Sequence, residues 1–344
     1  MPETQYFHQE ITLSSQSSPP NTKFPAKLAY FTLGSSSNPA VLLPTCFGGT
    51  LASTSPWLYT QESAPNATGP ILSTKEFFII VTALLGGGES SSPSNTPEPW
   101  SGPKFPGTTY EDNIHLQKSL CDSLGIGRLF AYIGFSMGGQ QAYHMATLYP
   151  DFVENMVCIA GSAKTSWHNW SFLEGPKFAL MHSVDFKDGE YGNVRPRRGI
   201  EAFKRVYSTW ALSQAWFRER CWRECGFESL EAYLNARWNG EQGDGNDLLA
   251  LIWTWQRGDI GIYFPEDGGD LGKTLGRIKS RCLVMPVRTD MYFPSEDSVE
   301  EVKCLEKGEL SVIESIWGHL AGGGGGSTED SEFMVKEITR FLGV

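Results

Sequence analysis

A G-x-S-x-G motif at residues 134–138 constrains the fold of this chain more than any other feature. The apolar residues 129–133 before the motif predict a buried strand, and apolar residues recur at helical spacing after it, up to Tyr149. Pro150 then ends the predicted helix. A sharp turn from strand to helix needs small residues, and it presents a serine hydroxyl at the helix N-terminus, where the peptide dipoles favour negative charge. An ordinary strand-to-helix turn is the alternative; we expect Ser136 to be a nucleophile.

A serine hydroxyl needs a base that removes its proton, and the base needs an acid that fixes its tautomer. Of the six histidines, His319 alone follows a predicted terminal strand. Asp290 comes directly after the strand predicted at residues 281–286, and Asp297 is the alternative acid. The order Ser136, Asp290, His319 is the one that a catalytic triad takes on a parallel sheet, with each residue at the carboxyl end of a strand. A helix-capping role for Asp290 and a structural loop role for His319 are the alternatives.

A glycine-rich loop follows an early apolar strand at residues 40–43 and includes Cys46 and Phe47. A loop at this place supplies a backbone N–H group that binds the negative oxygen of a tetrahedral intermediate. We expect this N–H group from Phe47, or else from Cys46, and a second one from Met137, the residue after the serine. A plain turn is one alternative. Cys46 as the nucleophile is another, for which the sequence shows no neighbouring base.

The predicted elements divide the chain into a core and an insertion. Residues 1–23 form a polar lead-in, and residues 24–163 and 276–344 alternate strands with helices. Residues 164–275 show helical periodicity and hold eight of the eleven tryptophans, most of which we expect to pack the insertion while one or two line an apolar pocket. The fold class is therefore α/β: a mostly parallel central sheet flanked by helices, with an inserted helical cap or lid. Strands are expected at residues 24–33, 38–44, 77–85, 129–133, 152–160, 281–286 and 310–316, and core helices at residues 108–124, 295–305 and 328–342.

Composition and charge narrow the classes of partner. The net charge of −11 argues against a nucleic-acid groove or an anionic membrane surface. No apolar run reaches the roughly 20 residues of a membrane span, and the first 23 residues lack the apolar stretch of a signal peptide. The seven cysteines have no spacing that predicts a metal site, and reduced thiols fit them best. We therefore expect a cytoplasmic protein that acts on a small molecule, without a metal, nucleic-acid or membrane partner.

Several longer runs resemble one family, the homoserine O-acetyltransferase-like branch of the α/β-hydrolase superfamily. GFSMGGQQA at residues 134–142, DMYFP at 290–294 and GH at 318–319 are similar to its nucleophile, acid and histidine motifs. DGEY at 188–191 and AFKR at 202–205 are similar to its cap pattern. The resemblance implies an α/β-hydrolase fold with a helical cap, an acyl-serine intermediate and pairing of two copies through the cap. No cofactor is expected, although acetyl-CoA or another acyl-CoA would be the co-substrate of an acyltransferase.

The chain departs from that family at two places near the expected site. Residues 45–49 are TCFGG in place of a His-Ala-Leu-Thr-Gly type sequence, and LAGGGGG replaces an acidic continuation after His319. These departures favour a substrate other than homoserine, and we expect hydrolysis of an ester or thioester of a small molecule, such as a tailoring step in secondary metabolism.

Two alternative functions stay open from the sequence. The first is CoA-dependent O-acyl transfer, for which a cationic cluster could bind the CoA phosphates. The same cluster also fits a solvated helix start; its members are Arg195, Arg197, Arg198, Lys204 and Arg205. The second, of another class, is a non-hydrolytic lyase or a ligand-binding protein that reuses the pocket.

Overall fold

The structure is a computed structural model that describes residues 2–56, 58–59 and 71–344. Among these residues, eight strands form one sheet with the order β1-β2-β4-β3-β5-β6-β7-β8. Strands β3 to β8 run parallel to one another, whereas β2 pairs antiparallel with β1 and β4. The strands are β1 Gln5–Thr12, β2 Lys23–Leu33, β3 Ala40–Pro44, β4 Phe78–Thr82, β5 Leu129–Phe135, β6 Val153–Ile159, β7 Arg281–Met285 and β8 Gly308–Leu310.

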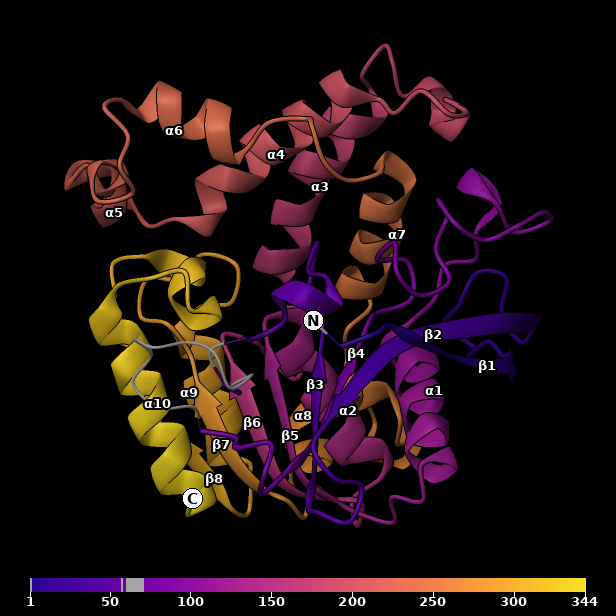
Figure 1. Cartoon of the computed structure of the whole chain (residues 1–344), viewed down its shortest axis with the longest axis vertical. Helices are drawn as coiled ribbons and strands as arrows, with labels where there is room; N and C mark the ends of the chain where they lie inside the picture. Colours follow the sequence, from indigo (N-terminus) through magenta and orange to yellow (C-terminus); the bar gives the residue numbers. More distant parts are fainter. Residues whose placement is uncertain (1, 57, 60–70) are drawn as a thin grey trace.

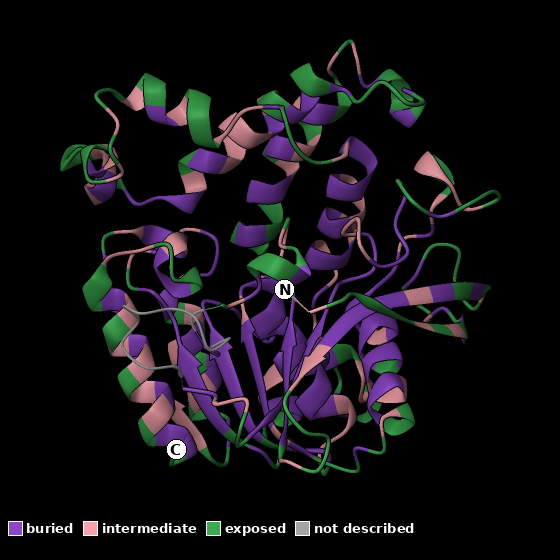
Figure 2. Ribbon diagram, in the orientation of Figure 1, coloured by how far each residue is buried: buried purple, intermediate pink, exposed green. Residues whose placement is uncertain are grey.

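Both faces of the sheet are covered, which explains the continuous apolar strands. Strands β3 and β4 are buried along their whole length. Alternate side chains point to opposite faces, so that Leu42 and Ile80 belong to one hydrophobic cluster while Val41 and Ile79 belong to the other. Figure 2 shows these buried strands at the centre and exposed residues on the outer surfaces of the helices.

The helices form two groups. Residues of α1, α2, α8 and α9 pack on one face of the sheet, and residues of α10 pack on the other. Helices α3 to α7 lie together beyond the carboxyl-terminal edge of the strands, at the top of Figure 1. The helices are α1 Tyr110–Ser123, α2 Met137–Leu148, α3 Trp167–Met181, α4 Arg197–Ala211, α5 Gln214–Arg218, α6 Leu230–Arg237, α7 Gly245–Gln256, α8 Leu271–Leu275, α9 Ser295–Lys303 and α10 Thr328–Leu342. The short 3₁₀ helices are η1 Leu51–Ser53, η2 Gly102–Lys104, η3 Lys187–Gly189, η4 Cys221–Arg223, η5 Ile260–Ile262, η6 Pro265–Asp267 and η7 Gly318–Gly323.

The predicted fold class is confirmed, and the first six expected strands and the core helices are present with bounds shifted by a few residues. Three expectations differ more. The segment 1–23, expected as a lead-in, contains β1, whose edge position leaves most of its residues exposed or half-buried and its sequence polar. The last strand, expected at 310–316, is the short edge strand β8, followed by an isolated bridge from Ile313 to Val287. Residues 260–275, expected in the cap, pack with the sheet, because Ile260 and Leu275 join the cluster that contains Leu42.

The chain crosses between the sheet and the cap twice, and the two crossings are bonded to each other. The N–H of Thr165 donates to the carbonyl oxygen of Gly258 at 2.7 Å, and the N–H of Ile260 donates to that of Ala163 at 3.2 Å. We call residues 163–165 and 258–260 the neck. The cap is therefore joined to the sheet by a hydrogen-bonded pair of segments rather than by two separate linkers.

Candidate active site

Ser136 lies on a strained turn between β5 and α2. Its backbone angles, φ 59° and ψ −126°, are uncommon for a residue other than glycine. Its N–H donates to the carbonyl oxygen of Ile159 in the neighbouring strand at 2.8 Å, which anchors the turn. A Cβ atom on Gly134 would lie 2.0 Å from the carbonyl oxygen of Gly138, so the strand and the helix can approach only with glycine there. This contact explains why the first position of the motif is glycine.

The structure brings Ser136, His319 and Asp290 into one hydrogen-bonded chain. Nε2 of His319 lies 2.9 Å from Oγ of Ser136, and Nδ1 of His319 lies 2.7 Å from Oδ2 of Asp290. The other carboxylate oxygen, Oδ1, accepts the N–H groups of Tyr292 at 2.8 Å and Phe293 at 3.2 Å. A carboxylate can only accept, so it holds the proton on Nδ1 and leaves the lone pair of Nε2 facing the serine hydroxyl. The arrangement can remove a proton from Ser136.

The alternative acid and another buried histidine lie outside this chain. Asp297 is on α9, and its carboxylate bonds to Ser166; burial raises the pKa of this carboxyl. On α2, Nδ1 of His144 lies 2.5 Å from the hydroxyl oxygen of Tyr263, and burial lowers the pKa of the imidazole to about 3. His144 is therefore a neutral core residue at physiological pH.

The loop after β3 presents unpaired backbone donors beside the serine turn. The N–H of Gly49 donates to the carbonyl oxygen of Cys46 at 3.1 Å, and Gly48 has φ +65°, which together form a tight turn with Phe47 and Gly48 at its centre. In the described part of the chain, the N–H groups of Phe47 and Met137 have no acceptor, whereas the N–H of Cys46 faces its own thiol sulfur. These groups can bind a negative oxygen, and we call residues 45–49 the oxyanion loop.

Cys46 does not have the properties of a nucleophile. Burial raises the pKa of the Cys46 thiol to about 11. The thiol therefore stays protonated at neutral pH, and a protonated thiol is a poor nucleophile. The hydroxyl of Ser136, by contrast, has a histidine nitrogen within hydrogen-bond distance.

Aromatic side chains of the cap cover the oxyanion loop, a feature that the sequence analysis did not identify by residue. The ring of Phe47 lies 5.1 Å from Tyr207, 5.9 Å from Phe203 and 5.7 Å from Trp255, measured between ring centroids. Ser136 and His319 keep exposed fractions of only 2% and 4%. The site is thus covered by aromatic rings and shielded from water. The loop sequence gave no signal for this packing, because the contacts join residues more than 150 positions apart.

Four of the five side chains in the cationic cluster, all except that of Arg198, bond to groups of the cap itself. Arg197 forms an ion pair with Glu241, and Arg205 forms one with Glu201 at 3.3 Å. Nζ of Lys204 donates to the carbonyl oxygen of Gln242 at 2.9 Å. Arg195 likewise donates to the carbonyl oxygen of Gly243, at 3.4 Å. The cluster therefore fits a solvated helix start better than a phosphate site.

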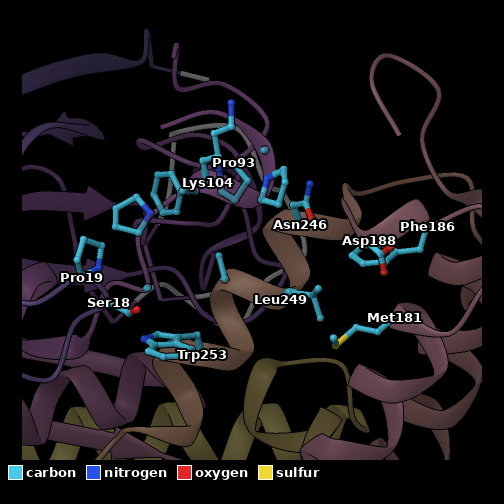
Figure 3. A pocket seen from close by; sticks show the side chains of 16 residues that line it. Ser18, Pro19, Pro93, Lys104, Met181, Phe186, Asp188, Asn246, Leu249 and Trp253 are labelled. Atoms are coloured by element: carbon cyan, nitrogen blue, oxygen red, sulfur yellow. The ribbon is translucent and has the colours of Figure 1, made fainter. Parts of the chain in front are cut away.

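A cavity of about 530 Å³ lies away from the triad (Figure 3). It is bordered by the α7 residues Leu249 and Trp253 and by Met181 at the end of α3. Trp255, which packs over the oxyanion loop, lies on another face of α7. None of the triad residues lines this cavity.

Neither a metal site nor a membrane span is found among the residues described. Within residues 2–56, 58–59 and 71–344, no group of three or more His, Cys, Asp or Glu side chains could hold a metal ion. No helix in the same ranges has the length and apolarity needed to cross a bilayer.

The chain is similar to known proteins both in sequence and in structure. Residues 39–198 match the family described as alpha/beta hydrolase fold. The ethyl acetate hydrolase of Pseudomonas veronii is 34% identical over 82% of this chain and 79% of its own length. The homoserine O-acetyltransferase of Methanosalsum zhilinae is 28% identical over 93% of this chain and 69% of its own. The crystal structure of the acetyl esterase MekB superposes with a TM-score of 0.90 at 30% identity, covering 99% of this chain and 97% of that one.

Proposed function

Because the chain belongs to the alpha/beta hydrolase superfamily, in its homoserine acyltransferase-like branch, we propose that it is a serine esterase that hydrolyses acetyl esters of small alcohols. Esterases and O-acyltransferases are its relatives, and the chain is an enzyme of this kind. One observation carries the proposal: the hydrogen-bonded chain from Ser136 through His319 to Asp290. Ethyl acetate hydrolase and acetyl esterase, the names of two relatives, support acetate as the acyl group.

The proposed mechanism has two steps. In the first, Oγ of Ser136 attacks the ester carbonyl while Nε2 of His319 takes its proton, and Asp290 stabilises the imidazolium. The carbonyl oxygen becomes an oxyanion held by the N–H of Met137 and that of Phe47 or Cys46. The imidazolium then gives its proton to the departing alcohol, which leaves an acetyl-serine. In the second step, water loses a proton to His319, attacks the acetyl-serine and releases acetate, and the proton returns to Ser136.

The shape of the site supports a small acyl group. The rings of Tyr207 and Trp255 lie 5.1 and 5.7 Å, between centroids, from the ring of Phe47 in the oxyanion loop. One methylene more or less in an apolar pocket changes kcat/KM by about 10- to 200-fold. We therefore expect acetate esters to react faster than butyrate esters.

CoA-dependent O-acyl transfer is the second candidate, favoured by the homoserine O-acetyltransferase relative. The same acetyl-serine would pass to an alcohol instead of water, with acetyl-CoA as donor. The ion pairs of the cationic cluster weaken the support that this cluster gives to CoA binding.

A cytoplasmic location and a homodimer through the cap stay predictions. The homodimer is supported by the exposed α3 face, where Trp167 is 81% exposed and Phe178 50%.

Intact-mass spectrometry and turnover test the proposal together. Wild-type protein and Ser136→Ala are treated with a fluorophosphonate probe, with p-nitrophenyl acetate and with acetyl-CoA. We expect a probe adduct and p-nitrophenol release in the wild type alone. Release of CoA from acetyl-CoA that requires an added alcohol would favour the acyltransferase. An absence of any adduct in the wild type would refute an activated serine and favour a binding protein or lyase.

A further inference from the structure

We infer that Gln141 is a positioning residue for the oxyanion hole, because its side-chain amide ties the two walls of the hole together. One wall is the oxyanion loop, reached at the carbonyl oxygen of Thr45; the other is the start of α2, reached at the carbonyl oxygen of Met137. The inference rests on the proposed function, since it concerns the place where the oxyanion forms.

The amide of Gln141 has a full set of partners in the protein interior. Gln141 is completely buried. Its Nε2 donates to the carbonyl oxygen of Thr45 at 3.0 Å and to that of Met137 at 3.2 Å, while its Oε1 accepts from Nε2 of Gln117 at 2.8 Å. The hydroxyl of Tyr132 in turn donates to Oε1 of Gln117 at 2.8 Å. Carbonyl oxygens can only accept, so the nitrogen of Gln141 must face both of them, and this fixes the orientation of the amide.

The bond to Thr45 controls the direction of a backbone donor. In a trans peptide unit the C=O and the N–H point in opposite directions. Holding the carbonyl oxygen of Thr45 therefore sets the direction of the N–H of Cys46. The next peptide unit is held in the same way, because the carbonyl oxygen of Cys46 accepts from Gly49 at 3.1 Å and so directs the N–H of Phe47. Gln141 thus fixes the first peptide unit of the loop and the direction of the Cys46 N–H, and the turn closed by Gly49, which starts from that peptide unit, directs the N–H of Phe47.

Gln140 provides a matched control one residue away on the same helix. It is also completely buried, with Oε1 accepting from the hydroxyl of Tyr110 at 2.8 Å and Nε2 donating to Oγ1 of Thr165 at 3.0 Å. None of these partners belongs to the oxyanion loop. A substitution of Gln140 therefore removes a comparable buried amide while the walls of the oxyanion hole stay tied.

The test compares Gln141→Leu with Gln140→Leu by steady-state hydrolysis of p-nitrophenyl acetate, by thermal unfolding and by inhibition with trifluoroacetone. This ketone forms an adduct with the catalytic serine that carries an oxyanion, so its affinity reports on the hole. Loss of one oxyanion donor lowers kcat by about 100- to 1,000-fold, and a misplaced donor should cost less. We expect Gln141→Leu to lower kcat about 10- to 100-fold with KM changed less than about threefold, and to lower ketone affinity by a similar factor. We expect Gln140→Leu to lower the unfolding temperature while kcat stays within about threefold of the wild type.

Three results would overturn the inference: an unchanged kcat in Gln141→Leu, equal losses of kcat in both variants, or a loss confined to KM. If Gln141→Leu does not fold, Gln117→Met carries the test, because it removes the donor to Oε1 of Gln141 without touching the loop. We then expect kcat to fall with KM unchanged, and an unchanged kcat overturns the role. A wild type without Ser136-dependent turnover refutes the proposed function as well, whereas wild-type turnover with an unaffected Gln141→Leu refutes the positioning role alone.

Discussion

The loops at the carboxyl edge of the sheet and the helices above them contribute to the same site in different ways. The sheet loops supply every group that we expect to bond with a reacting atom: the side chains of Ser136, Asp290 and His319, and the free N–H groups of the oxyanion loop and Met137. The cap supplies rings, among them Tyr207 and Trp255. We therefore propose that the sheet loops carry the chemistry and that the cap decides which substrates fit.

The two regions also differ in how their residues are held. The triad loops are anchored by hydrogen bonds that involve the backbone, such as those from the N–H of Ser136 to Ile159 at 2.8 Å and from the N–H of Gly318 to Oγ1 of Thr289 at 3.2 Å. The cap rings are held by contact with other rings, which tolerate changes of size better than hydrogen bonds tolerate changes of direction. Substitutions in the sheet loops should therefore alter rate, and substitutions in the cap should alter selectivity.

The largest effect is expected when the acid of the triad changes. Asp290→Asn keeps the shape of the side chain and an oxygen for the N–H groups of Tyr292 and Phe293. Its amide nitrogen can then face Nδ1 of His319, which favours the tautomer with the proton on Nε2 and removes the base for Ser136. We expect kcat for p-nitrophenyl acetate to fall about 1,000- to 10,000-fold at neutral pH, with an unchanged circular dichroism spectrum.

Asp297→Asn is the control, because this carboxylate bonds to Ser166 and not to the histidine. Its kcat should stay within about twofold of the wild type. A large loss in Asp297→Asn together with an active Asp290→Asn would contradict the assignment of the acid.

The sheet region could be predicted because its signals are local. Three signals lie within about twenty residues of one another: the apolar run of β5, the two motif glycines and the helical spacing of α2. Each signal by itself predicts one local feature, namely the strand, the sharp turn or the helix. Asp290 and His319 could be placed because each follows a strand of the same parallel sheet, whose carboxyl ends meet at one edge. The chain order alone then predicted three residues that the structure brings together.

The contacts across the site could not be predicted, because they depend on how distant segments pack. Nothing local to Phe47 shows that Tyr207 and Trp255 cover it. Gln141 lies inside the run GFSMGGQQA at residues 134–142, yet its partner Thr45 is 96 positions away. Residues 260–275 were expected in the cap because helical periodicity does not tell which surface a helix covers.

A smaller effect is expected when the cap ring over the oxyanion loop is removed. Tyr207→Ala opens space between Phe47 and Tyr292, whose ring centroids lie 5.1 and 4.8 Å from that of Tyr207. We expect the ratio of kcat/KM for p-nitrophenyl butyrate to that for p-nitrophenyl acetate to rise about tenfold. Tyr233→Ala removes a ring of the same size from the cap cluster around Trp216, away from the loop. It should lower the unfolding temperature and leave this ratio unchanged; a similar rise in both variants would contradict the assignment of selectivity to the loop-facing rings.

The smallest effect is expected at the neck, where the two regions meet. Oε1 of Glu301 on α9 accepts the N–H of Ala163 at 2.8 Å, and burial raises the pKa of the Glu301 carboxyl from 4.5 to about 8. Between these values the folded chain keeps a proton that the unfolded chain has lost, so the free energy of unfolding falls as the pH rises through this window.

Glu301→Gln keeps an oxygen for Ala163 and removes the titration. Its unfolding temperature, measured by scanning fluorimetry, should therefore rise relative to that of the wild type between pH 5.5 and pH 8.5, by about 2 °C or more. Glu300→Gln is the control, since this exposed carboxylate pairs with Lys303 at 2.6 Å. A difference between Glu301→Gln and wild type that does not change with pH would show that Glu301 is already ionised in the folded protein. The neck would then be joined by a charged hydrogen bond, and acid rather than base would weaken the link between the sheet and the cap.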